Sequence, residues 1–238
     1  MRLTVSCVIP AYNAERYLSA TIESALAQTG PFDEVIVADN GSTDRTAEIA
    51  RSFAEPVRVV PAEPARDQRA ARNVGLESAG GELVCFLDSD DLYLPVKTER
   101  QLERFEAEPG LAVCYSIVEC FWEPGLEAEE ERFRRHGRTR ATRVLQTAMI
   151  RRELIGQVGG FTQAVAGGAV PMLARITEAG CREDVVEEVL VRRRMHAESV
   201  SHKDSSLDAF LDLLKGRIDR RRGSAADCAQ RSSTESAG

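Results

Sequence analysis

The sequence predicts an α/β fold with a mainly parallel sheet flanked by helices, and three observations support this. Strand-like apolar runs alternate with helical patterns through the first hundred residues. The runs are almost continuous Val, Ile, Leu and Phe, as in strands that are buried on both faces. Apolar residues make up 43% of the 238 residues, which is enough to bury a sizeable core.

The expected elements of the first half follow in order along the chain. A strand over Leu3–Ile9 precedes a helix with Leu18, Ile22 and Leu26 on one face, as the spacing of apolar residues indicates. The next expected elements are a strand at Glu34–Ala38, a helix over Thr43–Phe53, a strand at Val57–Val60, a helix over Arg66–Ala79, a strand at Leu83–Leu87, and a helix from Pro95 through Phe105.

The second half is less regular. The expected elements there are a strand at Leu111–Cys120, an apolar piece at Val144–Ile150, a helix near Arg152–Val158, the turn Gly159–Gly160–Phe161, a helix around Pro171–Ala179 and a strand-like run at Val185–Val191. The charged segment Glu123–Arg143 is either a solvated loop or helix face, or a flap that faces substrate.

Composition excludes several classes of protein. Thirty-one basic against thirty-eight acidic residues give a net charge of −7, which argues against nucleic acid as a partner. No stretch reaches the roughly 18–20 apolar residues of a spanning helix, and the N-terminus does not read as a signal peptide. The six cysteines form no C-x-x-C pair, so no zinc knuckle or redox motif is indicated. We therefore expect a soluble, cytoplasmic protein.

Polar residues follow the first two expected strands. The first strand ends in Pro10, Ala11, Tyr12 and Asn13, and the second ends in the hexapeptide Asp39–Asp44. In an open parallel sheet, ligands bind beyond the carboxyl ends of the strands. The hexapeptide could therefore line a ligand, or it could serve only as a turn in which Ser42, Thr43 or Asp44 caps the next helix.

An acidic cluster, Asp88-Ser89-Asp90-Asp91, follows the strand that ends at Leu87. Carboxylates this close repel one another unless a cation compensates them, and hard oxygen ligands favour Mg²⁺ or Mn²⁺. The alternative is a hydrated acidic turn. A calcium hand is excluded, because Tyr93 stands where that motif requires glycine.

Arg72 lies in the helix that leads into this strand. An arginine there could bind a diphosphate with two parallel hydrogen bonds. It could equally be a surface arginine that pairs within its own helix.

Taken together, these segments resemble the family 2 glycosyltransferases over residues 3–105, and more thinly to about residue 202. The resemblance implies the A-type glycosyltransferase fold, with a Rossmann-like, mostly parallel sheet. The matching segments are Val8-Ile9-Pro10-Ala11-Tyr12-Asn13-Ala14, Asp39-Asn40-Gly41-Ser42-Thr43-Asp44, Ala71-Arg72-Asn73-Val74-Gly75 and Phe86-Leu87-Asp88-Ser89-Asp90-Asp91, with later landmarks at Ile150–Glu153, Val158–Phe161 and Arg194–Ser199.

The resemblance also implies a function and site residues. The chain would transfer a sugar, with inversion, from a nucleoside-diphosphate sugar, usually UDP-linked, to an unknown acceptor such as a glycan, a lipid phosphate or a peptide. The substrate-binding residues carried over are Pro10, Ala11, Tyr12, Asn13 and Asp39 around the nucleoside, Arg72 near the base or phosphates, Asp88, Ser89 and Asp90 around the ribose and metal, and His196 near the diphosphate.

The remaining expectations concern the metal, the role of His196 and the division of the chain. The metal, Mg²⁺ or Mn²⁺, would be held by Asp88 and Asp90 and would stabilise the leaving diphosphate. A purely structural role for His196 stays open. Residues 1–110 would form the nucleotide-sugar-binding half and residues 111–222 the acceptor-side half of one compact domain, followed by a disordered tail at residues 223–238.

The sequence departs from the family where the catalytic base is expected. An acidic pair normally follows the Gly-Gly-Phe turn, but here Ala169 and Val170 occupy that place. The downstream pair Glu183-Asp184 precedes a strand-like run instead of opening a helix, so we do not transfer the role to it. Either Asp91 or Glu153 substitutes, or the acceptor is already ionised and needs no base, or the chain is a non-catalytic nucleotide-sugar-binding or interaction protein.

An amphipathic pattern lies near the C-terminus. Leu207, Phe210, Leu211, Leu214 and Ile218 recur at helical spacing, and arginines gather after them. Such a helix could lie on the inner face of an anionic membrane and approach a lipid phosphate. Alternatively, it docks on the domain and its basic end complements the helix dipole.

Overall fold

The computed structural model describes residues 2–62, 68–137, 139–161 and 169–198. Residues from Met1 to His196 form one compact unit, and the rest of the chain, from Ala197 to Gly238, is assigned to a second unit. The amphipathic pattern around Leu207–Ile218 and the tail at residues 223–238 lie outside the described residues.

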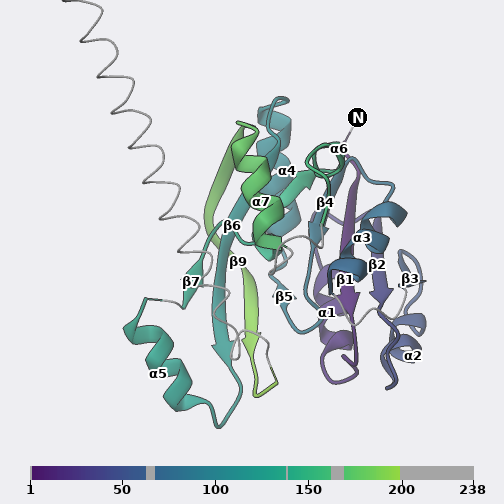
Figure 1. Cartoon of the computed structure of the whole chain (residues 1–238), viewed down its shortest axis with the longest axis vertical. Coiled ribbons are helices and arrows are strands. Elements are labelled where there is room, and N and C mark those ends of the chain that lie inside the picture. The colour runs from purple at the N-terminus through teal and green to yellow at the C-terminus, as the bar shows by residue number, and fades with distance from the viewer. Residues whose placement is uncertain (1, 63–67, 138, 162–168, 199–238) are drawn as a thin grey trace, which may run out of the picture. The chain divides into compact units, whose positions relative to one another are not determined.

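One sheet runs through the first unit in the order β3-β2-β1-β4-β8-β6-β9-β5, with β7 beside β6 (Figure 1). The neighbours β3, β2, β1 and β4 are parallel, and so are β6 and β9, whereas β8, β5 and β7 run antiparallel to their neighbours. The strands are β1 Val5–Ala11, β2 Glu34–Asp39, β3 Val57–Pro61, β4 Leu83–Phe86, β5 Leu92–Tyr93, β6 Val113–Trp122, β7 Arg140–Ala141, β8 Met149–Arg151 and β9 Glu183–Met195.

Helices cover both faces of the sheet. Buried side chains of α1, α2 and α4 pack against one face, and those of α3, α6 and α7 against the other. Among the described helices, none is both long enough and apolar enough to cross a bilayer. The helices are α1 Leu18–Leu26, α2 Thr46–Arg51, α3 Gln68–Ser78, α4 Lys97–Ala107, α5 Glu127–Arg135, α6 Arg152–Gln157 and α7 Ala169–Glu178, with a 3-10 turn at Leu145–Thr147.

The expected fold class is confirmed, and three details of the prediction are wrong. Leu26 is exposed, and the buried face of α1 includes the polar Thr21. The helix expected over Thr43–Phe53 begins only at Thr46, because the preceding residues are bound to the loop after β1. Two strands, β5 and β7, were not expected, since two-residue strands leave no periodic pattern.

The charged segment forms a solvated helix. None of the residues of α5 is buried, and its acidic and basic side chains pair one turn apart, as in Arg134 with Glu130 and Arg135 with Glu131. Figure 1 shows α5 standing away from the sheet, beyond β7. Phe133 of α5 contacts Trp122 of β6, with 6.0 Å between the ring centroids. The part of the segment that forms α5 is therefore a solvated helix.

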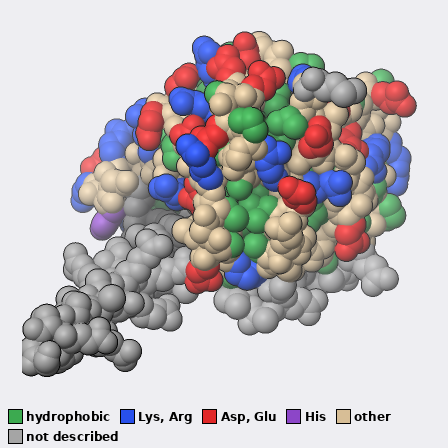
Figure 2. All heavy atoms as spheres, turned by 90° about the horizontal axis from the view of Figure 1, so that it is seen from above, with side chains coloured by type: hydrophobic (Ala, Val, Ile, Leu, Met, Phe, Trp, Pro, Cys, Tyr) green, Lys and Arg blue, Asp and Glu red, His purple; other side chains and the backbone are tan. Residues whose placement is uncertain are grey.

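The amino ends of the parallel strands lie on the face shown in Figure 2. Acidic and basic side chains are interspersed across that face, with some hydrophobic groups between them. The conspicuous sequence motifs follow the opposite, carboxyl ends of the strands. The search for a functional site therefore starts at the carboxyl edge.

Candidate functional site

Strand register brings the motifs together at the carboxyl edge of the sheet. The last residue of β1, Ala11, pairs with the last residue of β2, Asp39, and β4 lies on the other side of β1 with Phe86 opposite Val8. The polar segments that follow these three strands are consequently neighbours, although they lie up to eighty residues apart in the sequence. The expectation that the polar segments lie at the carboxyl ends of the strands is therefore confirmed.

Hydrogen bonds join the loops after β1 and β2. The Asn13 amide donates to Ser42 Oγ at 3.0 Å, and the Thr43 amide donates to Asn13 Oδ1 at 2.9 Å. Asn13 has φ of 48°, a left-handed conformation that asparagine tolerates better than most residues. Ser42 Oγ in turn donates to Asp39 Oδ1 at 2.5 Å. Asp39 is thus held in place at the tip of β2.

Tyr12 is conspicuous in this region because its side chain is 40% exposed. Its neighbours Pro10 and Ala11 are buried within β1. An aromatic ring exposed at the carboxyl edge contributes little to the core. Its face is suited to stacking on a flat ligand.

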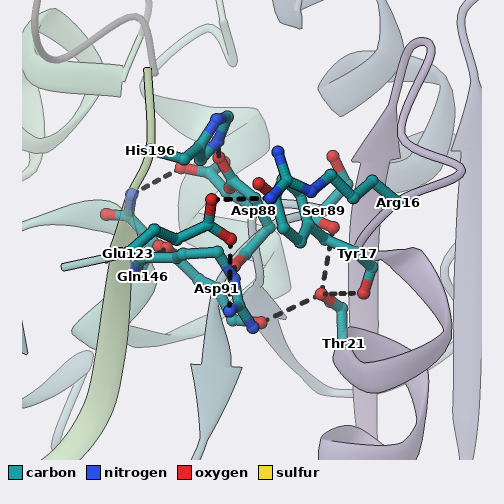
Figure 3. Close-up of polar contacts among 11 residues, drawn as sticks. Arg16, Tyr17, Thr21, Asp88, Ser89, Asp91, Glu123, Gln146 and His196 are labelled. Carbon is teal, nitrogen blue, oxygen red and sulfur yellow. Dashed lines mark hydrogen bonds and ion pairs between the residues drawn. The ribbon is translucent and has the colours of Figure 1, made fainter. Parts of the chain in front are cut away.

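The acidic loop is anchored from α1. Thr21 Oγ1 lies 3.0 Å from the backbone oxygens of both Ser89 and Asp91, and the Asp91 amide donates to the Asp88 backbone oxygen at 3.0 Å. Figure 3 shows Thr21 reaching the loop from below the site. A buried threonine on the inner face of α1 therefore fixes where the carboxylates lie.

Asp88 has two side-chain donors. Arg72 Nη2 donates to its Oδ1 at 2.9 Å, and Gln146 Nε2 donates to its Oδ2. Arg72 is only 7% exposed, so the alternative of a surface arginine pairing along its own helix is wrong. The sequence interpretation missed Gln146, although a long polar side chain within the run Val144–Ile150 could have indicated it.

Asn73 connects the Gly-Gly-Phe turn to this site. Its Nδ2 donates to the Phe161 backbone oxygen at 2.9 Å, and the Phe161 amide donates to its Oδ1 at 3.1 Å. Gly160 has φ of 58°, and a Cβ there would lie 3.3 Å from Asn73 Oδ1. The Phe161 ring then lies 6.0 Å from the Arg72 guanidinium. The turn therefore supports the arginine that holds Asp88.

Asp90 contacts His196. The distance from His196 Nε2 to Asp90 Oδ2 is 3.0 Å, and the histidine is nearly buried, with its ring 4.8 Å from that of Tyr17. Burial, followed by the charge of Asp88, raises the pKa of Asp90, while His196 opposes the shift. The structure thus brings together three residues that the sequence singled out, Asp88 and Asp90 of the acidic loop and His196 directly after β9.

Asp91 has a different environment from its neighbours. It is 2% exposed, and its Oδ1 accepts a hydrogen bond from the Arg194 amide at 2.9 Å. Burial and the charge of Asp90 raise its pKa well above the ordinary value. A carboxylate that is enclosed and engaged with the backbone cannot reach an acceptor, so the geometry argues against Asp91 as a substitute base.

Glu153 lies at the wrong edge of the sheet. It is exposed in α6, directly after β8, whose last residue Arg151 pairs with Leu83 at the start of β4. The acidic loop follows the other end of β4. The geometry therefore argues against Glu153 as well.

The pair Glu183-Asp184 is also distant from the acidic loop. Asp184 is the second residue of β9, where it is in register with Cys114 near the start of β6, and the strands β6 and β8 lie between it and β4. Glu183 bonds Arg143, and Asp184 lies 3.5 Å from Arg104. This supports the decision not to carry the catalytic role over to the pair. The helix α7 opens with Ala169 and Val170, which lack an acidic group.

A second group of charged side chains borders the site. Glu123, just after β6, bonds Arg16 at 2.8 Å and lies 4.0 Å from Arg194. Burial, then Glu123, raises the pKa of Tyr17 to about 12. Figure 3 shows Arg16 and Tyr17 on one side of the acidic loop and Glu123 and His196 on the other. Sequence interpretation missed Arg16, Tyr17 and Glu123, because no pattern connects residues so far apart along the chain.

The carboxylates of this site suit a divalent cation that is also bound by the phosphate oxygens of a ligand. Among the described residues, no three His, Cys, Asp or Glu side chains are grouped as a metal centre would require. Asp88 and Asp90 offer hard oxygen donors, and a cation would offset the repulsion that raises the pKa of Asp90. Phosphate oxygens would have to complete the coordination, as they commonly do for Mg²⁺.

Comparison with protein families identifies the chain. The model described as glycosyl transferase family 2 matches residues 6–166, more than half of the sequence. The chain belongs to glycosyltransferase family 2. This match covers all four motifs at the carboxyl edge.

Curated relatives match about two fifths of this chain. The Bacillus subtilis protein named putative teichuronic acid biosynthesis glycosyltransferase TuaG is 42% identical over 102 residues, which are 42% of this chain and 40% of that protein. The Escherichia coli protein named UDP-Glc:alpha-D-GlcNAc-diphosphoundecaprenol beta-1,3-glucosyltransferase WfgD is 38% identical over 99 residues, 41% of this chain and 39% of that one. The chain therefore spans about two fifths of the length of these relatives.

Solved structures share the fold of this chain. S. aureus TarS in complex with UDP superposes with a TM-score of 0.64 at 19% identity, over 88% of this chain and 71% of that one. The mannosyltransferase PcManGT from Pyrobaculum calidifontis, in complex with GDP-Man and Mn²⁺, gives 0.67 at 22% identity, over 92% and 65%. The A-type glycosyltransferase fold expected from the sequence is confirmed.

Proposed function

We propose that this chain transfers a sugar from a nucleoside-diphosphate sugar, with UDP as the nucleotide, to an acceptor, with inversion at the anomeric carbon. The observation that carries the proposal is the convergence of Asp39, Arg72, Asp88 and Asp90 at the carboxyl edge of one sheet. The relatives support it, because WfgD is named for a UDP-Glc donor and TarS binds UDP.

The nucleoside would lie over the loops after β1 and β2. Pro10, Ala11 and Asn13 shape this surface, Asp39 would accept a hydrogen bond from the base, and the exposed ring of Tyr12 would stack against it. Arg72 holds the carboxylate of Asp88 and so fixes the floor below the ribose and phosphates.

The cation, Mg²⁺ or Mn²⁺, would be held by Asp88 and Asp90 together with the diphosphate of the donor. Each oxygen of Asp88 accepts one hydrogen bond and keeps a second lone pair. When bound, the metal would stabilise the charge of the departing diphosphate. His196 orients Asp90 through the contact at 3.0 Å, and Ser89 presents its backbone oxygen to Thr21 and so fixes the loop.

We further propose a division of labour along the chain. Residues 1–110 would bind the donor, and residues 111–222 would face the acceptor. Strands from both stretches share one sheet within the described residues, which supports one domain with two roles. The acceptor would be a glycan, a lipid phosphate or a peptide, and not nucleic acid. A cytoplasmic location with peripheral contact to the membrane is supported by relatives that are named for lipid-linked acceptors.

The proposal is tested by measuring release of UDP from UDP-sugars in the presence of Mn²⁺ and a panel of glycans, sugar phosphates and lipid extracts. We expect release that depends on one donor and one acceptor class, and at least a hundredfold loss in Asp90→Asn, since the change removes one of the two carboxylates proposed to hold the cation that would stabilise the leaving diphosphate. Asp184→Asn, at the other edge of the sheet, should behave like wild type. Nucleotide binding without release on every acceptor would contradict transfer and favour a non-catalytic binding protein.

A further inference from the structure

Three arginines and two aromatic rings form a continuous stack beside the acidic loop. The Arg192 guanidinium lies 4.6 Å from the Phe121 ring centroid, Arg194 lies 4.8 Å from both Phe121 and Tyr17, and Arg16 lies 4.9 Å from Tyr17. We name this set, Arg192-Phe121-Arg194-Tyr17-Arg16, the arginine ladder. Strand pairing places it, since Phe121 of β6 is opposite Arg194 of β9.

Among the described residues, the three arginines of the ladder outnumber the acidic side chains that pair with them. Glu123 compensates Arg16 and Arg194 together, while Glu119, in register with Arg192, is bound by Arg140 at 2.8 Å. Within the described part of the chain, Arg192 has an exposed side chain and a ring contact but no ion pair. The outer end of the ladder therefore presents an uncompensated guanidinium to solvent.

The stacked arrangement determines which chemical groups the arginine ladder can bind. A neutral sugar binds an aromatic side chain through the open face of its ring, but guanidinium groups lie over Phe121 and Tyr17. What remains accessible at Arg192 is a planar fork of N–H donors, which matches the oxygens of a phosphate. Stacking on the ring also fixes the guanidinium and so reduces the entropy lost on binding.

The position of Arg192 separates it from the donor. It lies four residues before His196, so the two Cα atoms are about 13 Å apart along an extended strand. His196 is the residue that contacts Asp90. A single diphosphate does not span that separation. An anion at Arg192 would therefore belong to a different molecule from the nucleotide at Asp90.

We propose that the outer end of the arginine ladder, centred on Arg192, binds a phosphate or diphosphate group carried by the acceptor. The proposal rests on the proposed function and adds the class of acceptor to it. The ladder would anchor this group while the acceptor extends along β9 toward the donor.

The test uses the full chain saturated with UDP and Mg²⁺, so that the donor site is filled, and titrates it with glucose 1-phosphate or with glucose. Calorimetry reports affinity, and fluorescence of Trp122, the only tryptophan of the chain and the neighbour of Phe121, reports the location. We expect saturable binding of glucose 1-phosphate and none of glucose. Arg192→Gln should weaken binding about tenfold or more, as loss of a charge-assisted pair predicts. Arg51→Gln, an exposed arginine in α2, is the matched control.

Three results would overturn the proposal: glucose 1-phosphate fails to bind the UDP-saturated protein, glucose binds equally well, or Arg192→Gln binds like wild type. Failure of the proposed function can be distinguished from failure of this proposal, because the protein would then not bind UDP in the first step of the experiment. Vesicles of phosphatidylcholine with and without phosphatidic acid distinguish the sources of the phosphate. Binding to phosphatidic acid that Arg192→Gln loses identifies a lipid headgroup, whereas binding of glucose 1-phosphate alone identifies a soluble acceptor.

Discussion

At the scale of single residues, the three aspartates of the acidic loop differ through their partners. Asp88 is bound by Arg72 and Gln146, Asp90 contacts His196, and Asp91 is enclosed and accepts a backbone hydrogen bond. Spacing along the sequence identified all three as candidates. It could not rank them, because each partner lies at least sixteen residues away along the chain.

Asn73 belongs to one of the motifs that resemble the family, and in the structure it holds the Gly-Gly-Phe turn beside the site. We expect Asn73→Ala to lower the free energy of unfolding by about 1–3 kcal/mol, since two partly buried hydrogen bonds to the Phe161 backbone are lost. Urea denaturation measures the change. Asn73→Asp keeps the acceptor for the Phe161 amide and should lose less than the alanine variant at low pH, where its carboxyl is protonated. Equal stability of wild type and Asn73→Ala would show that this link does not hold the turn.

At the scale of elements, the close packing of α3 on β1 depends on one glycine. A Cβ at Gly75 would lie 2.3 Å from Val8 Cγ1, inside any tolerable contact. Glycine is a poor helix former, so its presence within α3 reflects this approach and not helix propensity.

We therefore expect Gly75→Ala to destabilise the protein by about 1–3 kcal/mol through overpacking, despite the higher helix propensity of alanine. The double variant Gly75→Ala with Val8→Ala should recover part of the loss, because it removes the clashing methyl groups. Denaturant unfolding of the single and double variants gives the coupling between the two sites. A double variant whose effects simply add would contradict the packing argument.

Asp44 joins the loop after β2 to the start of α2. Its Oδ1 accepts from the Thr46 amide at 2.9 Å, and its Oδ2 accepts from the Glu15 amide at 3.0 Å. Burial alone would raise the pKa of Asp44, but the hydrogen bonds from Thr46 and Glu15 outweigh it and lower the pKa. Asp44 lies one residue before Arg45, the N-cap residue of α2, and its bond with the Thr46 amide ties the hexapeptide to the first residue of that helix.

A lowered carboxyl pKa stabilises the fold above the unfolded value, about 3.9, and this contribution disappears as the pH falls through the folded value. We expect Asp44→Asn to lose about 1 kcal/mol at pH 7, as for other helix caps. The difference from wild type should shrink in acid, below the folded pKa. Unfolding curves at several pH values measure it. A loss that is independent of pH would show that the charge of Asp44 contributes nothing.

The antiparallel strands show which elements could not be predicted. The two residues of β5 position Asp91 beside Arg194 by pairing with β9, about one hundred positions later in the chain. A strand so short carries no periodicity, and its partner is fixed by tertiary packing. The parallel strands β1 to β4 were predictable because each is a buried apolar run.

At the scale of the whole molecule, the site proposed for the donor was predictable from the sequence and the arginine ladder was not. Sheet topology forces residues after β1, β2 and β4 to one edge, so ordered motifs translate into a site. The ladder, in contrast, arises from strand register between β6 and β9 and from a loop near residue 16. No local pattern records that register.

The most direct test of a metal-dependent nucleotide site at this edge is thermal unfolding of wild type and Asp90→Asn with UDP, each with and without Mn²⁺. UDP at about 100 times its Kd should add roughly 2.7 kcal/mol, a rise in Tm on the order of 5–10 °C. We predict this rise for wild type only when Mn²⁺ is present, and its loss in Asp90→Asn. An equal rise without Mn²⁺, or an undiminished rise in Asp90→Asn, would contradict a nucleotide held through metal at Asp90.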